Sequence, residues 1–368
     1  MRLCLAVCSY AALALVVAGC NGHGLSNSFA PPSPSQTGDG VSTERVQAGM
    51  GPATASGIAE FSAPHAAGAI LSDGRGSEYF SAGYPAAVVQ FDEKYHLIGR
   101  SFFLPHPNKA TYPYALALSP SGGDVWFSGN SGELGFFKPK SKPKFREFKL
   151  RTEHGAVDGL TAGPDHAMWF TVNRGSNPIK IGRISTFSHQ VTSYTLSAYG
   201  PVFGITLGPD GAMWFAVWGS IGRIGTNGQA TEYSIGGNKA YGITTGPDGA
   251  IWFTGEATVG GPMLGRIDLV THARKIIRYG KAGTIGNQAI VTRGSSLWMT
   301  SFDAGTIDHY DTSTHTVYRR RLPPGYTEPY GMALGADNQL WFINYSGSDG
   351  AIGKLCPDQD DQECANSP

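Results

Sequence analysis

The chain has 368 residues, 41% of them hydrophobic, and its 28 Lys and Arg balance 28 Asp and Glu. This hydrophobic fraction can bury a core, which excludes disorder throughout, and the balanced charge offers no basic footprint for nucleic acid. The 51 glycines, which have no three-residue period, and the 11% aromatic content indicate many tight turns between short strands.

Residues 1–20 have the form of an export signal. Arg2 precedes an apolar stretch from Leu3 to Val17, which is too short to span a bilayer and is followed by a polar segment. The small residues before Cys20 resemble the lipobox of bacterial lipoproteins, whose cysteine receives lipid when the signal is cleaved. The sequence therefore predicts an exported lipoprotein, anchored to a membrane at Cys20, in the periplasm or at the outer membrane. Ordinary signal cleavage without lipid is the alternative.

Two polar segments flank the body of the chain. Residues 21–55 are rich in Ser, Pro and Gly, lack apolar periodicity, and are expected to form a disordered tether. The tail, residues 356–368, holds Cys356 and Cys364. These cysteines are expected to form a disulfide in an oxidising compartment, and two free thiols are the alternative.

The body, residues 56–355, consists of seven repeats. The segments GPDHAMWFT, GPDGAMWFA and GPDGAIWFT are near-copies of one another, and GADNQLWFI is a fourth copy. Each repeat has one aromatic marker, and successive markers lie 38 to 47 residues apart: Tyr79, Trp126, Trp169, Trp214, Trp252, Trp298 and Trp341. This spacing is typical of four-stranded propeller blades.

Each repeat divides into four short strands. The Trp-Phe pair of the second strand is expected to fill the space between blades, and the Pro-Asp-Gly segment before it suits a turn. The last repeat lacks an outer strand, whereas an unpaired outer-strand pattern, residues 57–62, precedes the first. The sequence therefore predicts an all-β, seven-bladed β-propeller, closed by the N-terminal strand joining the last blade. Two β-sandwiches of half the length are excluded by the unbroken period.

One end of this propeller, the mouth, is expected where the first strand of each blade begins and the second ends. The residues expected there are aromatic with a few polar groups: Tyr114, Asp158, Phe203, Trp218, Tyr241, Glu256, Gln288 and Tyr330. Such a surface suits a small molecule, a glycan or a peptide. In the alternative interpretation the rings only fill the channel. His154, in a loop near Asp158, could act as a base, although no spacing fixes a partner for it.

The repeated G-x-D-G-x-x-W-F-T followed by I-G-R-I is similar to the repeat of the virginiamycin B lyase (streptogramin lyase) family, over the whole body of the chain. The resemblance implies a seven-bladed propeller. It also implies a reaction, because the characterised enzymes of the family linearise cyclic streptogramin B antibiotics by Mg²⁺-dependent elimination at the ester linkage.

The catalytic pattern of that family is only partly present. The active blade of the lyases reads E-P-H-G-I in its first strand and W-F-T-E in its second, with a histidine at the same place in the preceding blade. Here Glu328 matches, but Tyr330 and Asn344 replace the histidine and the second glutamate, and Gln288 stands in the preceding blade. Neutral amides anchor a hard cation poorly, and tyrosine is a poor base at neutral pH. Glu256 lies one place late in the fifth blade, where the strand pleat is expected to point it elsewhere.

The sequence therefore predicts a monomeric, lyase-like propeller that binds a ligand at its mouth without performing the lyase reaction. One alternative is an active carbon-oxygen lyase, with Mg²⁺ as its cofactor, that uses Glu328, Glu256, Asp158 or His154 in a rearranged site. Another is a structural protein-interaction propeller of the cell envelope.

Overall fold

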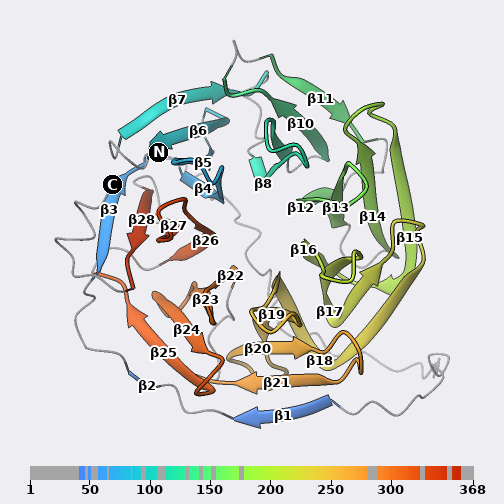
Figure 1. Ribbon diagram of the computed structural model, residues 1–368, viewed down its shortest axis with the longest axis vertical. Helices are drawn as coiled ribbons and strands as arrows, with labels where there is room; N and C mark the ends of the chain where they lie inside the picture. Colours follow the sequence, from blue (N-terminus) through green and yellow to red (C-terminus); the bar gives the residue numbers. More distant parts are fainter. Residues whose placement is uncertain are drawn as a thin grey trace, which may run out of the picture. The chain divides into compact units, whose positions relative to one another are not determined.

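The computed structural model describes most of the body of the chain as strands and turns (Figure 1). The described residues are 41–45, 49–50, 57–63, 66–83, 85–92, 97–105, 113–129, 132–140, 144–150, 155–173, 178–280, 288–323, 328–345 and 350–357. The chain divides into the units Met1–Gly38 and Asp39–Pro368, and every described residue belongs to the second. No helix in the described part is long and apolar enough to cross a membrane.

The second unit is a β-propeller of seven blades, each an antiparallel sheet whose first strand is innermost (Figure 1). Blade 1 holds β4 (Ala66–Ser72), β5 (Ser77–Ala82), β6 (Ala87–Asp92) and β7 (Leu97–Phe103). Blade 2 holds β8 (Pro113–Leu118), β9 (Val125–Gly129), β10 (Glu133–Phe137) and β11 (Arg146–Lys149). Blade 3 holds β12 (Ala156–Ala162), β13 (Ala167–Asn173), β14 (Pro178–Ser185) and β15 (Val191–Tyr199).

Blades 4 and 5 share one continuous sheet, because two long strands each serve two places in it. Blade 4 holds β16 (Val202–Leu207), β17 (Met213–Ile224) and the first part of β18 (Ala230–Thr245). Blade 5 holds the second part of β18, β19 (Ile251–Glu256), β20 (Pro262–Ile267) and β21 (Arg274–Arg278). The β17–β18 register shifts between Trp218, which pairs with Lys239, and Ser220, which pairs with Ser234. The chain passes from blade 4 to blade 5 within β18, between these two partners.

Blade 6 holds β22 (Ile290–Arg293), β23 (Ser296–Ser301), β24 (Thr306–Asp311) and β25 (Thr316–Arg321). Blade 7 holds β26 (Pro329–Leu334), β27 (Leu340–Asn344), β28 (Ala351–Leu355) and β3 (Ile58–Ser62). The N-terminal strand β3 pairs antiparallel with β28, with Phe61 opposite Ile352. The strand that the sequence analysis placed at the outer edge of the last blade does lie there.

The core lies between the blades, as the Trp-Phe pairs predict. Adjacent residues of a strand point to opposite faces of its sheet, so the two rings of one pair enter different interfaces. Trp169 of blade 3 packs with Phe215 of blade 4, whereas Phe170 packs with Trp126 of blade 2. All four side chains are fully buried or nearly so.

The glycine of the I-G-R-I pattern has a steric reason. A Cβ atom on Gly182, in the third strand of blade 3, would lie 2.1 Å from ring atoms of Phe170 in the second strand. The same conflict recurs between Gly222 and Phe215 in blade 4. The phenylalanine of one motif thus requires the glycine of the other.

Two short strands lie within residues 21–55, the segment that was predicted to be a disordered tether. β1 (Val41–Arg45) pairs parallel with β21 along five residues, and β2 (Gly49–Met50) pairs parallel with β25. Both occupy the outer edges of blades 5 and 6 (Figure 1). The unpaired N–H and C=O groups of those edge strands offer hydrogen bonds that composition alone does not reveal.

Cys356 follows β28, is fully buried, and is disulfide-bonded. Its backbone N–H donates to the carbonyl of Gly57 at 2.8 Å, which extends the pairing of β28 with the N-terminal strand. Cys364 lies outside the described residues, so its pairing with Cys356 stays a prediction. The export signal and Cys20 also lie outside them.

Candidate functional site

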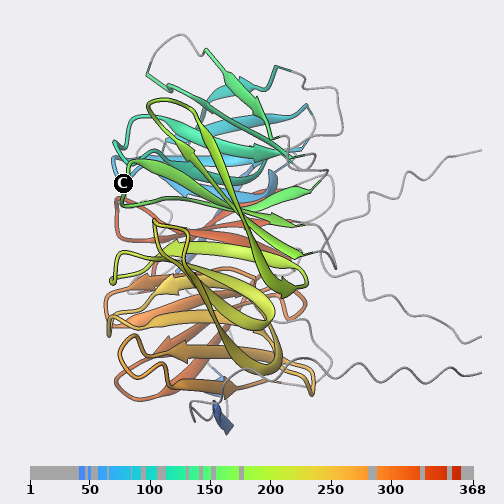
Figure 2. The same cartoon turned by 90° about the vertical axis from the view of Figure 1, so that its right-hand side faces the viewer.

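The strands of each blade run between two faces of the propeller (Figure 2). We call one the turn face: it carries the turns from first to second strand, such as residues 208–212, and from third to fourth, such as residues 268–273. The mouth is the opposite face, where first strands begin and second strands end. These two faces contain different parts of the repeat.

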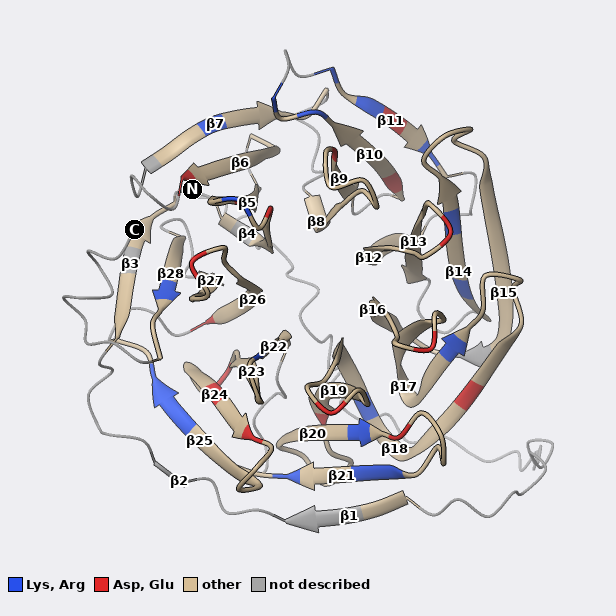
Figure 3. Cartoon of the chain, in the orientation of Figure 1, with Lys and Arg blue, Asp and Glu red and all other residues tan. Residues whose placement is uncertain are grey.

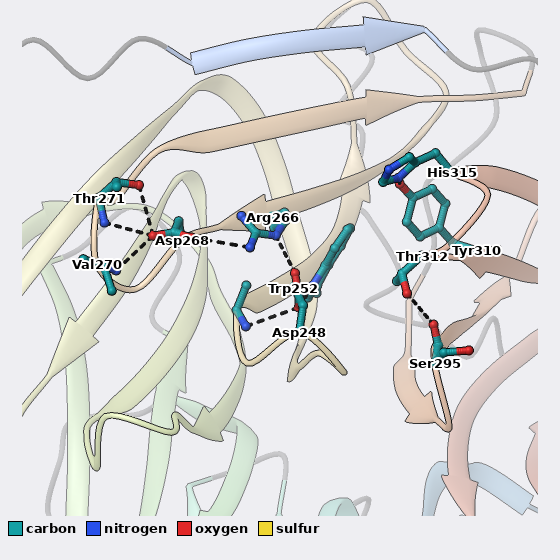
Figure 4. A network of polar contacts seen from close by, with 11 residues as sticks. Asp248, Trp252, Arg266, Asp268, Val270, Thr271, Ser295, Tyr310, Thr312 and His315 are labelled. Atoms are coloured by element: carbon teal, nitrogen blue, oxygen red, sulfur yellow. Dashed lines mark hydrogen bonds and ion pairs between the residues drawn. The ribbon is translucent and has the colours of Figure 1, made fainter.

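The repeat signature forms a hydrogen-bonded network at the turn face. In blade 4, one oxygen of Asp210 accepts from Trp214 Nε1 at 3.0 Å, and the other accepts from Arg223 Nε at 2.7 Å. The same arrangement joins Asp165, Trp169 and Arg183 in blade 3, Asp248, Trp252 and Arg266 in blade 5, and Asp337, Trp341 and Lys354 in blade 7. Figure 3 shows the acidic turns and basic third strands, and Figure 4 the copy in blade 5. The most repeated residues are therefore structural.

The hydroxyl group of the W-F-T motif is structural as well. Thr171 Oγ1 accepts from the N–H of Gly159 in its own blade at 2.8 Å and donates to the carbonyl of Phe203 in the next blade at 2.7 Å. Ser128 makes the matching pair with Ala115 and Val157. These hydroxyls fix the innermost strands of neighbouring blades to each other just below the mouth.

The mouth begins with one residue per innermost strand, which we call the ring residues: Gly68, Tyr114, Asp158, Phe203, Tyr241, Gln288 and Tyr330. They differ from blade to blade. The Tyr330 ring lies so close to Gly68 that a Cβ on Gly68 would be 2.9 Å from it. The glycine of blade 1 thus leaves room for the tyrosine of blade 7.

An aromatic group occupies the mouth at blades 4 and 5. The Phe203 ring meets the Tyr241 ring edge to face, with centroids 5.2 Å apart, and lies 6.3 Å from the Trp218 ring. Phe203 and Trp218 are partly exposed, whereas Tyr241 is only 6% exposed. Tyr241 therefore belongs to the core, as the channel-filling interpretation expects, and Trp218 with Phe203 forms the accessible part.

An ion pair closes this aromatic group on the side of blade 5. Glu256 Oε2 accepts from Lys239 Nζ at 3.0 Å and from the Tyr241 hydroxyl at 3.3 Å. Burial, and then the Glu256 charge, raise the pKa of Tyr241, so its hydroxyl stays protonated. Lys239 Nζ also lies 5.0 Å from the centre of the Trp218 ring, which is a cation–π contact.

The sequence analysis was wrong about the direction of Glu256 and did not include Lys239. Glu256 lies directly opposite Lys239 in the β18–β19 pair, so its side chain is on the same side of the sheet as that of Lys239, and it accepts from both Lys239 and Tyr241. Lys239 could have been found from its place, because it lies two residues before the ring residue Tyr241 and so on the same side of the strand.

Asp158 is the charged ring residue of blade 3. Its Oδ2 accepts from Asn173 Nδ2 at 2.7 Å. Burial raises the pKa of Asp158 to about 6, although the Asn173 hydrogen bond acts in the opposite direction. The carboxyl group therefore changes its charge close to neutral pH, which is a property of acid and base groups in sites.

A second polar group lies at the mouth of blades 6 and 7. Asn344, fully buried at the end of β27, accepts from the backbone N–H of Glu328 at 3.0 Å through its Oδ1. Burial, and then the charge of Asp303, raise the pKa of Glu328. The ring of Tyr330 meets that of Phe302 edge to face at 6.0 Å, and its carbonyl accepts from Thr300 Oγ1. Glu328 and Asn344 are thus joined by a hydrogen bond, whereas the Tyr330 ring contacts Phe302, and the role of the three residues in a site stays a prediction.

Gln288 lies two residues before the start of β22, and its backbone N–H donates to the Thr300 carbonyl at 3.1 Å. Tyr114, in β8, is partly buried at its ring place. His154 lies outside the described residues, so its role as a base stays a prediction.

No protein with a curated description matches this chain in sequence.

The model of the virginiamycin B lyase family matches residues 93–258 and 217–365, which together span most of the chain. The chain belongs to the virginiamycin B lyase family. A streptogramin B lyase structure aligns with a TM-score of 0.70 at 27% identity, covering 81% of this chain and 97% of that one. A catalytically inactive virginiamycin B lyase from Staphylococcus aureus, with quinupristin, gives 0.71 at 26% identity, covering 81% and 99%. A chain of the mitotic checkpoint complex, 11% identical with a TM-score of 0.67, shares the fold alone.

The Mg²⁺ expected of a lyase in this family does not fit the residues present. The Oδ1 atom of Asn344 is used by the backbone N–H of Glu328, and the amide brings no negative charge. Within the described ranges, no group of three or more His, Cys, Asp or Glu side chains could hold a metal ion. The described part of this virginiamycin B lyase family propeller thus offers no cluster of carboxylates for Mg²⁺.

Proposed function

We propose that this virginiamycin B lyase family propeller is an exported, lipid-anchored protein that binds a small molecule, a glycan or a peptide at its mouth. The observation that carries the proposal is the accessible aromatic pair Phe203 and Trp218 beside the Lys239–Glu256 ion pair. Rings with a few oriented polar groups are the usual composition of a small-molecule site. We expect the ligand to bind without a chemical reaction, because most of the family's catalytic positions are substituted.

Trp218 is the best single position for testing the binding proposal. Its ring is partly exposed, and one of its faces is near the Lys239 ammonium. A ligand could therefore stack on the exposed part of the ring. Tyr241 is less suitable, because its burial means that truncation would also remove core contacts.

Binding can be tested by isothermal titration of the full chain with quinupristin, the compound held by the Staphylococcus aureus lyase variant. We expect binding without ring opening, and a loss of affinity of at least about 10-fold in Trp218→Ala. The matched control is Phe103→Ala, which removes an exposed ring from the outer strand of blade 1. Equal affinities of the two variants, or no binding by the unchanged chain, would count against the mouth as a quinupristin site.

An active lyase with a rearranged site is the second candidate function. It is favoured by the raised pKa values of Asp158 and Glu328, because a carboxyl group with a raised pKa is better suited to take up and release a proton near neutral pH. Ring opening of a streptogramin B antibiotic, followed by mass spectrometry with and without Mg²⁺, tests it. Turnover that disappears in Glu328→Gln would establish this candidate, and an intact ring in every sample would remove it.

The lipid anchor has its own test. In Cys20→Ala, the protein should move from the membrane fraction of cells to the soluble exported fraction, because no acceptor for lipid is left. Cys8→Ala, inside the predicted signal, is the matched control and should stay with the membrane. An unchanged distribution of Cys20→Ala would refute lipid anchoring.

A further inference from the structure

The direction of β1 fixes where the N-terminal tether joins the propeller. β1 runs parallel to β21, with Val41 opposite Arg274 and Arg45 opposite Arg278. β21 leaves the turn face, because it directly follows the turn from Asp268 to Ala273. Val41 is therefore at the turn face, and β1, which runs in the same direction as β21 (Figure 1), leads from there toward the mouth. The chain preceding Val41 joins the propeller at the rim of the turn face.

Two turns on this face present large apolar side chains to solvent. Val270, at the tip of the turn between β20 and β21, is 88% exposed, and Phe187, at the same place between β14 and β15, is 77% exposed. Both turns follow one pattern, with a capping residue two places before the tip and a histidine two places after it. Figure 4 shows Val270 projecting from its turn beside Asp268.

Side-chain oxygens accept hydrogen bonds from the backbone N–H groups of both tips. Asp268 Oδ1 accepts from the N–H groups of Val270 and Thr271 at 3.0 and 2.9 Å, and Ser185 Oγ accepts from that of Phe187 at 3.3 Å. The histidine in each turn, such as His272 with φ of 56°, takes the left-handed conformation that closes it. The matching turn of blade 6 has Ser313 at its tip, so the fold itself does not require an apolar residue there.

We propose that the turn face of blades 3 to 5 rests on a lipid bilayer, with Val270 and Phe187 entering its interface and the mouth facing away from the membrane. The inference rests on the lipid anchor proposed at Cys20. Twenty residues separate Cys20 from Val41, and a flexible chain of that length has a mean span of about 25 Å. A tether so short, joined at the turn-face rim, keeps these tips near the bilayer, where exposed apolar side chains are stabilised by partial burial.

The orientation can be measured with an environment-sensitive fluorophore on single cysteines. Val270→Cys and Val259→Cys form a matched pair, because both valines lie in exposed turns of blade 5, and Val259, 67% exposed, is in the mouth-side turn between β19 and β20. Cys356 is disulfide-bonded, and the parent chain without a new cysteine gives the labelling background. The membrane-derived protein is reconstituted into vesicles of phosphatidylcholine with phosphatidylglycerol.

With the label at position 270 we expect a blue shift, quenching by spin-labelled lipids, and protection from aqueous iodide. With the label at 259 we expect free access of iodide and no quenching by lipid. The reverse pattern, or equal behaviour of the two labels, overturns the orientation. Protection of 270 from iodide without lipid quenching also overturns it, and would indicate a protein partner on the turn face instead.

A second measurement separates the orientation from the anchor. The same labelled proteins, carrying Cys20→Ala and an N-terminal histidine tag, are tethered to vesicles that contain nickel-chelating lipid. Suppose that Cys20→Ala stays in the membrane fraction of cells but the label at position 270 still contacts lipid on these vesicles. The proposed lipid anchor is then wrong, and the proposed membrane-facing surface is supported. A third measurement uses the Cys20→Ala protein without a histidine tag, which has no tether to the vesicles. Here Val270→Ser together with Phe187→Ser should lower the partition of the protein onto vesicles about 10-fold, whereas Val259→Ser should leave it unchanged. Equal partition of all variants would refute the surface.

Discussion

At the turn face, blades 3, 4 and 5 repeat the same three side chains in the same geometry, whereas at the mouth these blades present Asp158, Phe203 and Tyr241. The first set holds each blade together, so a change in one blade would cost that blade its hydrogen bonds. The three mouth residues stand at equivalent positions of the backbone, but no contact is repeated from one blade to the next. The comparison teaches that the recognisable repeat marks the structural end of this propeller, and that the variable end is where ligand selection can act.

Blades 2 and 6 show what replaces the network where its aspartate is missing. The Nε1 atoms of Trp126 and Trp298 are buried without a hydrogen-bond acceptor in the described part of the chain. Each ring is instead covered by a stacked neighbour on the third strand, Phe136 with centroids 4.8 Å apart and His309 at 4.3 Å. Ring stacking thus takes the place of the arginine and its carboxylate.

Removing the carboxylate of the network should have the largest effect on stability. In Asp210→Ala, the buried Trp214 N–H and the Arg223 guanidinium lose their acceptor, which should cost about 3 kcal/mol of unfolding free energy. Denaturant titration measures this loss. Asp210→Asn keeps the acceptor for Trp214 and should lose roughly half as much. Equal stabilities of all three proteins would contradict a structural role for the repeated aspartate.

Removing the Thr171 hydroxyl, which links neighbouring blades, should have the second largest effect on stability. In Thr171→Val the shape of the side chain is kept, but the Gly159 N–H and the Phe203 carbonyl lose their shared partner, at a cost of about 2 kcal/mol. Thermal unfolding of the variant tests this prediction. Thr258→Val is a control on the mouth side of blade 5, where the Asn238 side chain keeps its bond to the Thr258 backbone, and it should cost less. The reverse order of the two variants would contradict the assignment.

The mouth should respond in the opposite direction. The pKa of Asp158 in the folded protein, about 6, lies above its ordinary value of 3.8, so the folded state holds the proton more strongly and loses stability as pH rises from about 4 to 6. Asp158→Asn should therefore gain about 1 kcal/mol at pH 7.5, since the residue keeps some contact with solvent, and gain nothing at pH 4. Denaturant titrations at both pH values test it, and a variant less stable at pH 7.5 would show that the charge is stabilising.

A residue of the turn face that departs from the repeat should give the smallest effect. His166 has φ of 54° at the place where Gly211 and Gly249 stand in the next two blades. His166→Gly removes the strain of the left-handed conformation but loosens the unfolded chain, for a net gain of about 0.5 kcal/mol. Differential scanning calorimetry should show a rise of about 1 °C. Gly211→His, the reciprocal change, should lower the transition, and a rise there would contradict the argument.

Much of the fold was predictable, because each repeat contains its own turn, its own inter-blade rings and its own fitting glycine. The sequence analysis therefore found the blades and the strand that pairs with β28. It did not find β1 and β2, which have little apolar pattern of their own and depend on the free edges of β21 and β25. At the mouth it identified Phe203 and Trp218, but it treated Tyr241 as accessible, and burial at a blade junction depends on the neighbouring blade.

The sequence by itself determined the period, the turns and the two rings that separate one blade from the next, since these follow from contacts within about 45 residues of chain. Only the tertiary structure decided how Lys239, Glu256, Trp218 and Tyr241 meet, because the residues at these places differ from blade to blade and the repeated motif does not specify their contacts. It also decided the direction of β1, through an edge more than 200 residues away in sequence. Local regularity encodes the scaffold of this protein, and the packing of unlike residues across blades creates its candidate site.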